Sequence, residues 1–137
     1  MEPVIQSLLA GLPVFLLHLA TSIAVFLAAL GIYLWITPHA EMALIRDGNQ
    51  AAAISLGGAA LGLAIPMAFC LSASINVWDI IVWGAVTLIV QIVAFRAVDL
   101  VLRDLPKRIE RDERPAAIFL ASMKIAVALL NAAAVAG

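Results

Sequence analysis

The chain has 137 residues, of which 65% are apolar and only 12% are charged, and its mean hydropathy is +1.12. Because soluble domains carry about 25% charged residues, this composition excludes a soluble globule. The formal net charge of −1 says little, since the placement of Lys and Arg decides how a membrane protein is oriented. The apolar residues suffice for about four membrane-spanning helices of ~20 residues, which leaves no room for a soluble catalytic domain.

The first apolar stretch has no charged residue over positions 3–38, which is longer than a bilayer requires. The triplet Gly-Leu-Pro at positions 11–13 predicts a break inside it, because glycine and proline are typical of the residues around a helix start. We therefore expect a short interfacial lead-in, followed by a first span over residues 14–36.

Three further apolar stretches follow. We place the second span at residues 51–73, the third at 78–100 and the fourth at 116–136, so the chain ends as the last helix leaves the membrane. The sequence thus predicts an all-α, polytopic membrane protein. Residues 1–137 form a single four-helix transmembrane domain in contact with the lipid bilayer.

The loops give the expected orientation. The loop over residues 101–115 contains five Lys or Arg residues, the loop over residues 37–50 contains Arg46, and the opposite side of the membrane has none. The positive-inside rule places such loops in the cytoplasm. We therefore expect two cytoplasmic loops, with both termini on the periplasmic side of the bacterial inner membrane.

A short internal match indicates a duplication. Residues 52–56 and 116–120 are identical at four of five positions, at an offset of 64 residues, and the same offset aligns the first span with the third. A unit of two helices re-enters the membrane in its original orientation, so the chain would consist of two parallel two-helix repeats. Chance similarity between alanine-rich segments is the alternative, and the sequence leaves both open.

Two motifs resemble a known family. They are Ile-Thr-Pro-His-Ala-Glu at residues 36–41 and Gly-Asn-Gln-Ala-Ala-Ala at residues 48–53, followed by the glycine-rich stretch at 58–66. This pattern resembles the bacterial inner-membrane family called domain of unknown function 350, also grouped as uncharacterised protein family 0719. The resemblance implies an integral inner-membrane protein without an established activity, and it transfers no catalytic residue. It also includes Trp83, Gln91 and Asn131.

Polar residues inside the spans are candidates for function, because ionisable groups in a membrane are costly. Lys124 lies near the middle of the fourth span, and no acid is expected at a comparable depth. Asp99, at the cytoplasmic end of the third span, is expected to form a boundary ion pair with Arg96, three residues earlier. Two polar layers result: an inner one that contains Lys124 and Gln91, and an outer one, nearer the periplasmic side, that contains His18, Thr21, Ser22 and Asn131. Alternatively, these groups only form hydrogen bonds between helices, and Lys124 extends toward the headgroups. The candidate pathway comprises Lys124, Gln91, Asn131, His18, Thr21 and Ser22.

The second span contains a candidate packing motif. Gly58 and Gly62 form a Gly-x-x-x-Gly step, which allows two helix backbones to approach closely. Pro66 follows one turn later and is expected to kink the helix. This motif packs helices within one subunit as readily as between subunits.

No catalytic nucleophile with its base, acid pair or metal site can be assembled from the sequence, and phosphate-binding or cofactor motifs are absent. We therefore expect no enzyme, no cofactor, no metal site and no nucleic-acid partner. Two functions stay open. One is a homo-oligomeric ion channel or transporter with a polar pathway near Lys124. The alternative is a membrane scaffold whose basic cytoplasmic loop recruits a protein partner or anionic lipid through Lys107, Arg108 and Arg111.

Overall fold

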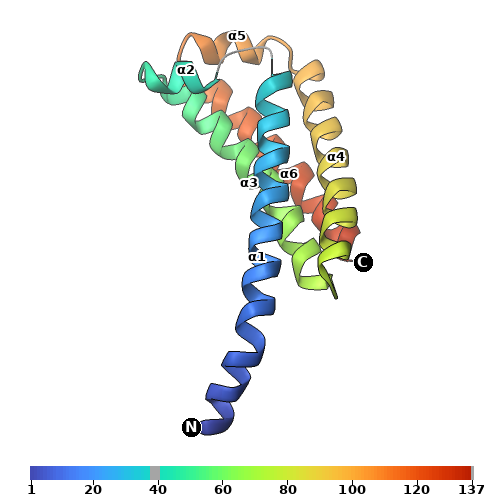
Figure 1. The fold of residues 1–137 in the computed structure, drawn as a ribbon. Coiled ribbons are helices and arrows are strands. Elements are labelled where there is room, and N and C mark those ends of the chain that lie inside the picture. The colour runs from blue at the N-terminus through green and yellow to red at the C-terminus, as the bar shows by residue number, and fades with distance from the viewer. Residues whose placement is uncertain (38–40, 137) are drawn as a thin grey trace.

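The computed structural model describes residues 1–37 and 41–136. Over these residues the chain consists of helices joined by short turns, and four of the helices are long and apolar enough to cross a membrane (Figure 1). The predicted all-α class with four membrane-spanning helices is therefore confirmed. In chain order the helices are α1 (Glu2–Ile36), α2 (Glu41–Arg46), α3 (Gln50–Ala73), α4 (Val77–Val101), α5 (Leu105–Glu110) and α6 (Arg114–Ala136).

Helices α3, α4 and α6 begin and end within two residues of the spans expected from the sequence. The break expected at residues 11–13 is wrong, because α1 continues through Pro13 as one helix of 35 residues. Proline removes one hydrogen bond, here to the carbonyl group of Leu9, but apolar helix-forming residues on both sides let the helix resume. The expected interfacial lead-in is thus the first part of α1.

α1 extends far beyond the other long helices at the end where the N-terminus lies (Figure 1). Its 35 residues correspond to about 52 Å, whereas the hydrocarbon core of a bilayer is ~30 Å thick. The first 17 residues of the chain are all exposed. The described part of the chain therefore leaves this apolar segment uncovered.

Among the long helices, α3 and α6 pack most closely, and α4 packs to a similar extent against α1 and against α3. α3 and α6 approach closely at Gly58, where an added Cβ atom would lie 2.8 Å from the Cα atom of Ala121. A large apolar core lies between α1, α3 and α4 and includes Tyr33, Leu63 and Phe95. This arrangement brings α4 and α6, which carry most of the buried polar residues, into contact.

α2 and α5 lie together at one end of the bundle, which we call the connector end (Figure 1). The Asn49 side chain accepts a hydrogen bond from the Ala52 amide (2.8 Å), which caps α3, and donates one to the Ile109 carbonyl (3.0 Å). The Asp112 carboxylate accepts a hydrogen bond from the Ala51 amide (2.9 Å). Each connector therefore satisfies backbone groups of the other half of the chain.

The offset of 64 residues found in the sequence recurs in the structure. α2 and α5 begin and end 64 residues apart. Gly48 and Asp112, also 64 residues apart, both have a positive φ, of 89° and 61°. The same backbone turn thus ends both short helices, which supports a duplication. The two halves are not packed identically. α3 packs extensively against α4, whereas the equivalent pair, α6 with α1, has no comparable contact among the described residues.

Candidate functional site

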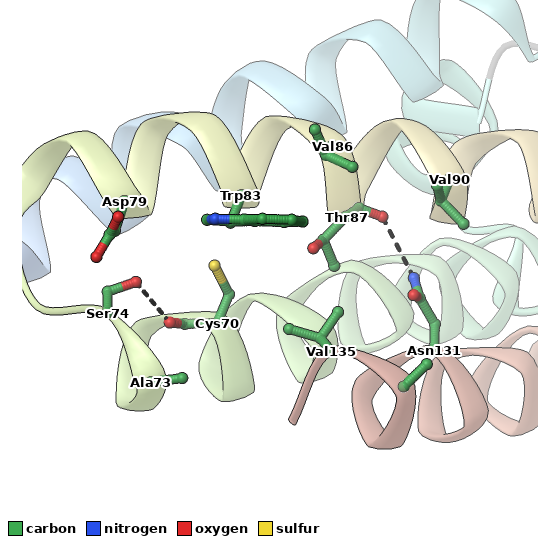
Figure 2. A pocket seen from close by; sticks show the side chains of 11 residues that line it. Cys70, Ala73, Ser74, Asp79, Trp83, Val86, Thr87, Val90, Asn131 and Val135 are labelled. Atoms are coloured by element: carbon green, nitrogen blue, oxygen red, sulfur yellow. Dashed lines mark hydrogen bonds between the residues drawn. The ribbon is translucent and has the colours of Figure 1, made fainter. Parts of the chain in front are cut away.

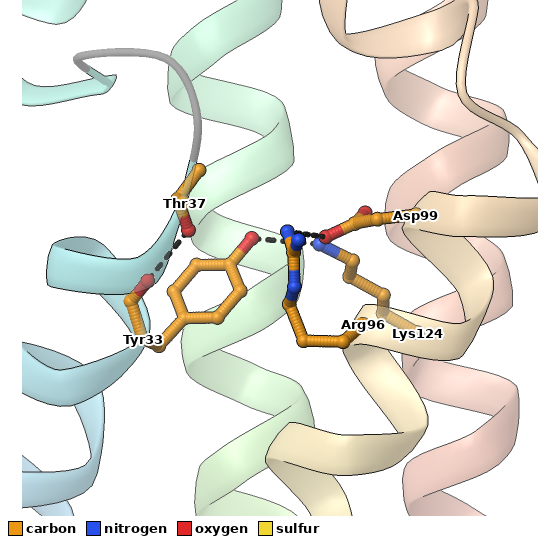
Figure 3. A network of polar contacts seen from close by, with 5 residues as sticks. All are labelled: Tyr33, Thr37, Arg96, Asp99 and Lys124. Atoms are coloured by element: carbon orange, nitrogen blue, oxygen red, sulfur yellow. Dashed lines mark hydrogen bonds and ion pairs between the residues drawn. The ribbon is translucent and has the colours of Figure 1, made fainter.

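The centre of the candidate site is Lys124 of α6, whose side chain is only 1% exposed (Figure 3). Its ammonium nitrogen Nζ lies 3.1 Å from Oδ1 of Asp99 on α4, and it donates a hydrogen bond of 2.6 Å to the hydroxyl group of Tyr33 on α1. The Tyr33 and Phe95 ring centroids lie 4.8 and 5.2 Å from Nζ, within the range of cation–π attraction. Three membrane-spanning helices therefore meet at one buried charge.

The position of Asp99 corrects one expectation. The sequence placed Asp99 at the end of the third span and expected no acid at the depth of Lys124. The long side chain of Lys124 extends toward the connector end, so its charged end reaches Asp99 although its Cα atom lies deeper. The charged end of Lys124 therefore pairs with the Asp99 carboxylate inside the protein and does not extend to the lipid headgroups.

Two further charged residues complete this cluster. Arg96, whose side chain is 36% exposed, lies 3.8 Å from Asp99, one turn earlier on α4 (Figure 3). Glu41 of α2 is buried, and its carboxylate acts electrostatically on both Tyr33 and Lys124. Two cations and two anions thus balance each other formally, as buried charges require. We call these five residues, Tyr33, Glu41, Arg96, Asp99 and Lys124, the charge network.

A second polar group lies farther from the connector end. Nδ2 of Asn131 on α6 donates hydrogen bonds to Oε1 of Gln91 (2.9 Å) and to the Thr87 carbonyl (3.2 Å) on α4. Gln91 Nε2 and Thr87 Oγ1 are buried and have no hydrogen-bond partner within the described residues. Gln91 therefore pairs with Asn131, and does not form the predicted inner layer directly with Lys124.

The outer layer expected from the sequence is not assembled. The hydroxyl groups of Thr21 and Ser22 donate to the carbonyls of Leu17 and His18, each at 2.8 Å, so these hydrogen bonds stay within α1. α1 packs against α3 and α4, whereas Asn131 points from α6 toward α4. The structure therefore does not bring His18, Thr21 and Ser22 together with Asn131.

The buried residues where α4 and α6 meet lie along one boundary, which we call the α4–α6 seam. Every fourth residue of α4 from Thr87 to Asp99 is buried, and these residues follow a ridge of the helix. Phe95 separates Gln91 from Asp99 along this ridge. The seam comprises Thr87, Gln91, Phe95 and Asp99 of α4, with Lys124 and Asn131 of α6.

A cavity lies at each end of the seam. The first, of about 460 Å³, is lined by Cys70, Asp79, Thr87 and Asn131 among others, and Figure 2 shows how these residues are arranged around it. The second, of about 360 Å³, lies at the connector end between α4 and α5, and Asp99 lines it. Residues at both ends of the seam therefore line a cavity.

The glycines expected to pack helices border the seam. Gly58 lies against Ala121, and a Cβ atom at Gly62 would lie 2.5 Å from Cζ of Phe95. Pro66 is fully buried one turn farther along α3. Gly62 thus provides the space that the Phe95 ring occupies.

The basic residues proposed as partner or lipid contacts lie at the connector end. Lys107 and Arg111 are exposed, whereas Arg108 forms an ion pair with Glu113 at 3.2 Å. Lys107 also lines the second cavity.

The sequence did not indicate Tyr33, Glu41 or Phe95 as site residues, and for Asp99 it predicted only a boundary ion pair with Arg96. One signal was present, because Tyr33 is the single tyrosine of the chain and lies within an apolar span. Glu41 gave no such signal, since its burial depends on how α2 folds back on the bundle.

Long apolar helices with ionisable residues buried between them define a multi-pass helical membrane protein. A family described as Domain of Unknown Function (DUF350) matches residues 7–135. The UPF0719 inner membrane protein YjfL of Escherichia coli (strain K12) is 31% identical over 130 residues, which cover 95% of this chain and 96% of YjfL. YjfL of Escherichia coli O157:H7 gives the same values.

The chain therefore belongs to the DUF350 family, and the resemblance seen in its sequence is confirmed. It is an inner membrane protein with several membrane-spanning helices. No solved structure matches it significantly.

Proposed function

We propose that this protein is a small ion channel or transporter in which ions move along the α4–α6 seam. The observation that carries the proposal is the series of buried polar groups in the seam, with a cavity at each end. Ionisable residues within membrane-spanning helices commonly mark ion or substrate pathways. Transport along the seam would give these buried polar groups a role, and we therefore favour transport over catalysis.

The Lys124–Asp99 pair is costly if its only role is packing. Well-packed apolar residues of similar size are often as stable as a buried ion pair, or more stable. An ion moving through the seam needs polar or charged groups close to its path in place of its hydration shell, and Lys124 and Asp99 are such groups. The pair is therefore better explained by transport than by stability.

The groups between the first cavity and the ion pair have free hydrogen-bonding capacity. Thr87 Oγ1 and Gln91 Nε2 have no partner within the described residues, and leaving buried polar groups unpaired costs free energy. Water or a permeating ion would satisfy them. This supports passage of small polar species between the first cavity and Gln91.

Phe95 is the proposed constriction of the pathway. Its fully buried ring separates Gln91 from the charge network and packs against Gly62. Apolar constrictions can close a pore by excluding water. In this proposal the seam conducts when the Phe95 ring moves aside.

A homo-oligomer with its connector end in the cytoplasm is part of this proposal. The uncovered N-terminal part of α1 offers an apolar surface to a second copy of the chain. The Lys and Arg residues of the loops favour a cytoplasmic connector end. Both termini would then lie on the periplasmic side.

The test is ion flux into liposomes that contain the purified protein, measured with small anions and with monovalent cations. We expect flux with the native chain and its loss in Lys124→Met, Gln91→Met and Asn131→Leu. Thr21→Val is the matched control, because it also removes a polar group from a membrane-spanning helix, but outside the seam. Flux that survives all three seam substitutions would exclude this pathway.

The second candidate function is a membrane scaffold. The exposed Lys107 and Arg111 at the connector end favour it, because they are available to a partner. Folded, correctly oriented protein that passes neither anions nor cations would support this function. Changing Lys107, Arg108 and Arg111 to Glu should then remove a partner that co-purifies with the native chain.

A further inference from the structure

We propose that the cavity between α4 and α5 binds the phosphate group of an anionic phospholipid. This cavity is also the one at the connector end of the seam, so a bound lipid would occupy that end of the proposed pathway. The cavity has a volume of about 360 Å³ and lies at the connector end. Its lining residues are Arg96, Asp99, Leu100, Arg103, Pro106, Lys107 and Glu110.

Three cations line this cavity, and two of them lack a partner. Arg103 and Lys107 form no ion pair within the part of the chain that the structure describes, and Arg96 is 3.8 Å from Asp99. Arginine and lysine that converge on one cavity are the groups that bind phosphate oxygens. The cavity therefore offers donors that the protein itself does not use.

The acids of the cavity do not cancel these charges. Asp99 is already held by Lys124 at the closer distance of 3.1 Å, so its charge is largely balanced from inside the bundle. Glu110 is exposed at the end of α5, and its single negative charge can balance only one of the positive charges in the cavity. A positive charge therefore remains on the side of the cavity that faces outward.

The surroundings favour a lipid over free phosphate. Leu100 lines the cavity and is 65% exposed, and its neighbour Val101 is 80% exposed. In a membrane these side chains lie where acyl chains pack, next to the level of the headgroups. Clusters of Lys and Arg immediately next to the end of a membrane-spanning helix commonly bind anionic lipid headgroups.

The experiment measures lipid binding to the full chain by native mass spectrometry in detergent, with phosphatidylglycerol or phosphatidylcholine added at equal concentrations. We expect the native chain to prefer phosphatidylglycerol. The double variant Arg103→Gln/Lys107→Gln should bind it about tenfold more weakly, or worse. The matched control is Arg111→Gln/Arg114→Gln, which removes the same charge from exposed residues outside the cavity and should bind like the native chain.

Three results would overturn the proposal. Equal binding of the two lipids would exclude recognition of the anionic headgroup. Equal losses in both double variants would show diffuse attraction to the basic loop rather than a site. Displacement of the lipid by inorganic phosphate at a similar concentration would identify free phosphate as the ligand. Because this experiment measures lipid binding and not ion flux, it tests the lipid site even if the protein transports no ion.

Discussion

Asp99 and Lys124 place their charged atoms 3.1 Å apart, on different helices and with both side chains buried. Neither charge could be buried alone without a large cost, because an isolated ion loses its hydration in an apolar interior. The pair therefore fixes the position of α4 relative to α6. It also means that each buried charge is stabilised by the other.

This dependence gives the first prediction. Asp99→Asn or Lys124→Met alone leaves one buried charge without its main partner, so we expect each to destabilise the protein by about 3–5 kcal/mol. The double variant removes both charges and should recover most of that loss. Unfolding of the three variants in detergent, followed by circular dichroism, measures these differences.

Additive losses in the double variant would contradict the prediction, because they would mean that the two residues act independently. Glu2→Gln serves as the control, because Glu2 is exposed at the start of α1, and this variant should unfold like the native chain.

The second prediction concerns the contact between α3 and α6. Gly58→Ala places a methyl group against the Cβ and Cα atoms of Ala121, so the helices must separate, at a cost of about 1–3 kcal/mol. Gly57→Ala is the matched control, because a Cβ atom there meets nothing within 4 Å. Thermal unfolding of both variants measures their loss of stability, which we expect only for Gly58→Ala. A loss of the same size at Gly57 would point to helix flexibility rather than packing.

Most of the fold could be predicted from the sequence because membrane-spanning helices are determined by local composition and length. The bounds of α3, α4 and α6 followed directly from apolar stretches and their flanking charges. The start of α1 did not, since the sequence does not show whether a proline in an apolar stretch begins a helix or lies inside it. Pro13 lies inside.

The candidate site could be predicted only in part, for a physical reason. Depth along each span is readable from the sequence, and it correctly singled out Lys124 as buried in the apolar region. Which faces meet depends on helix rotation and on side-chain reach, and neither is local. Lys124 therefore meets Asp99, and Asn131 meets Gln91, whereas the polar residues of α1 remain apart.

The third prediction concerns the link between the two connectors. Asn49→Asp keeps the oxygen that caps α3 at Ala52 but loses the donor to the Ile109 carbonyl, whereas Asn49→Ala loses both. We expect Asn49→Ala to cost about 1 kcal/mol more than Asn49→Asp, which is the usual value of a helix cap. Hydrogen exchange of the α3 and α5 amides measures both effects. Equal protection in the two variants would show that the cap contributes nothing.

The last prediction addresses Phe95 and depends on the proposed function. Phe95→Ala removes the ring that separates Gln91 from the charge network, so ions should pass through the seam more readily and flux should rise several-fold. The substitution also leaves a cavity that destabilises the protein by about 3–5 kcal/mol. Leu88→Ala is the control, because Leu88 is buried on α4 within the apolar core and outside the seam, so its loss loosens the bundle to a similar extent. Liposome flux of the two variants separates the two effects. Equal flux would mean that loosening alone explains any increase and that Phe95 does not close the pathway.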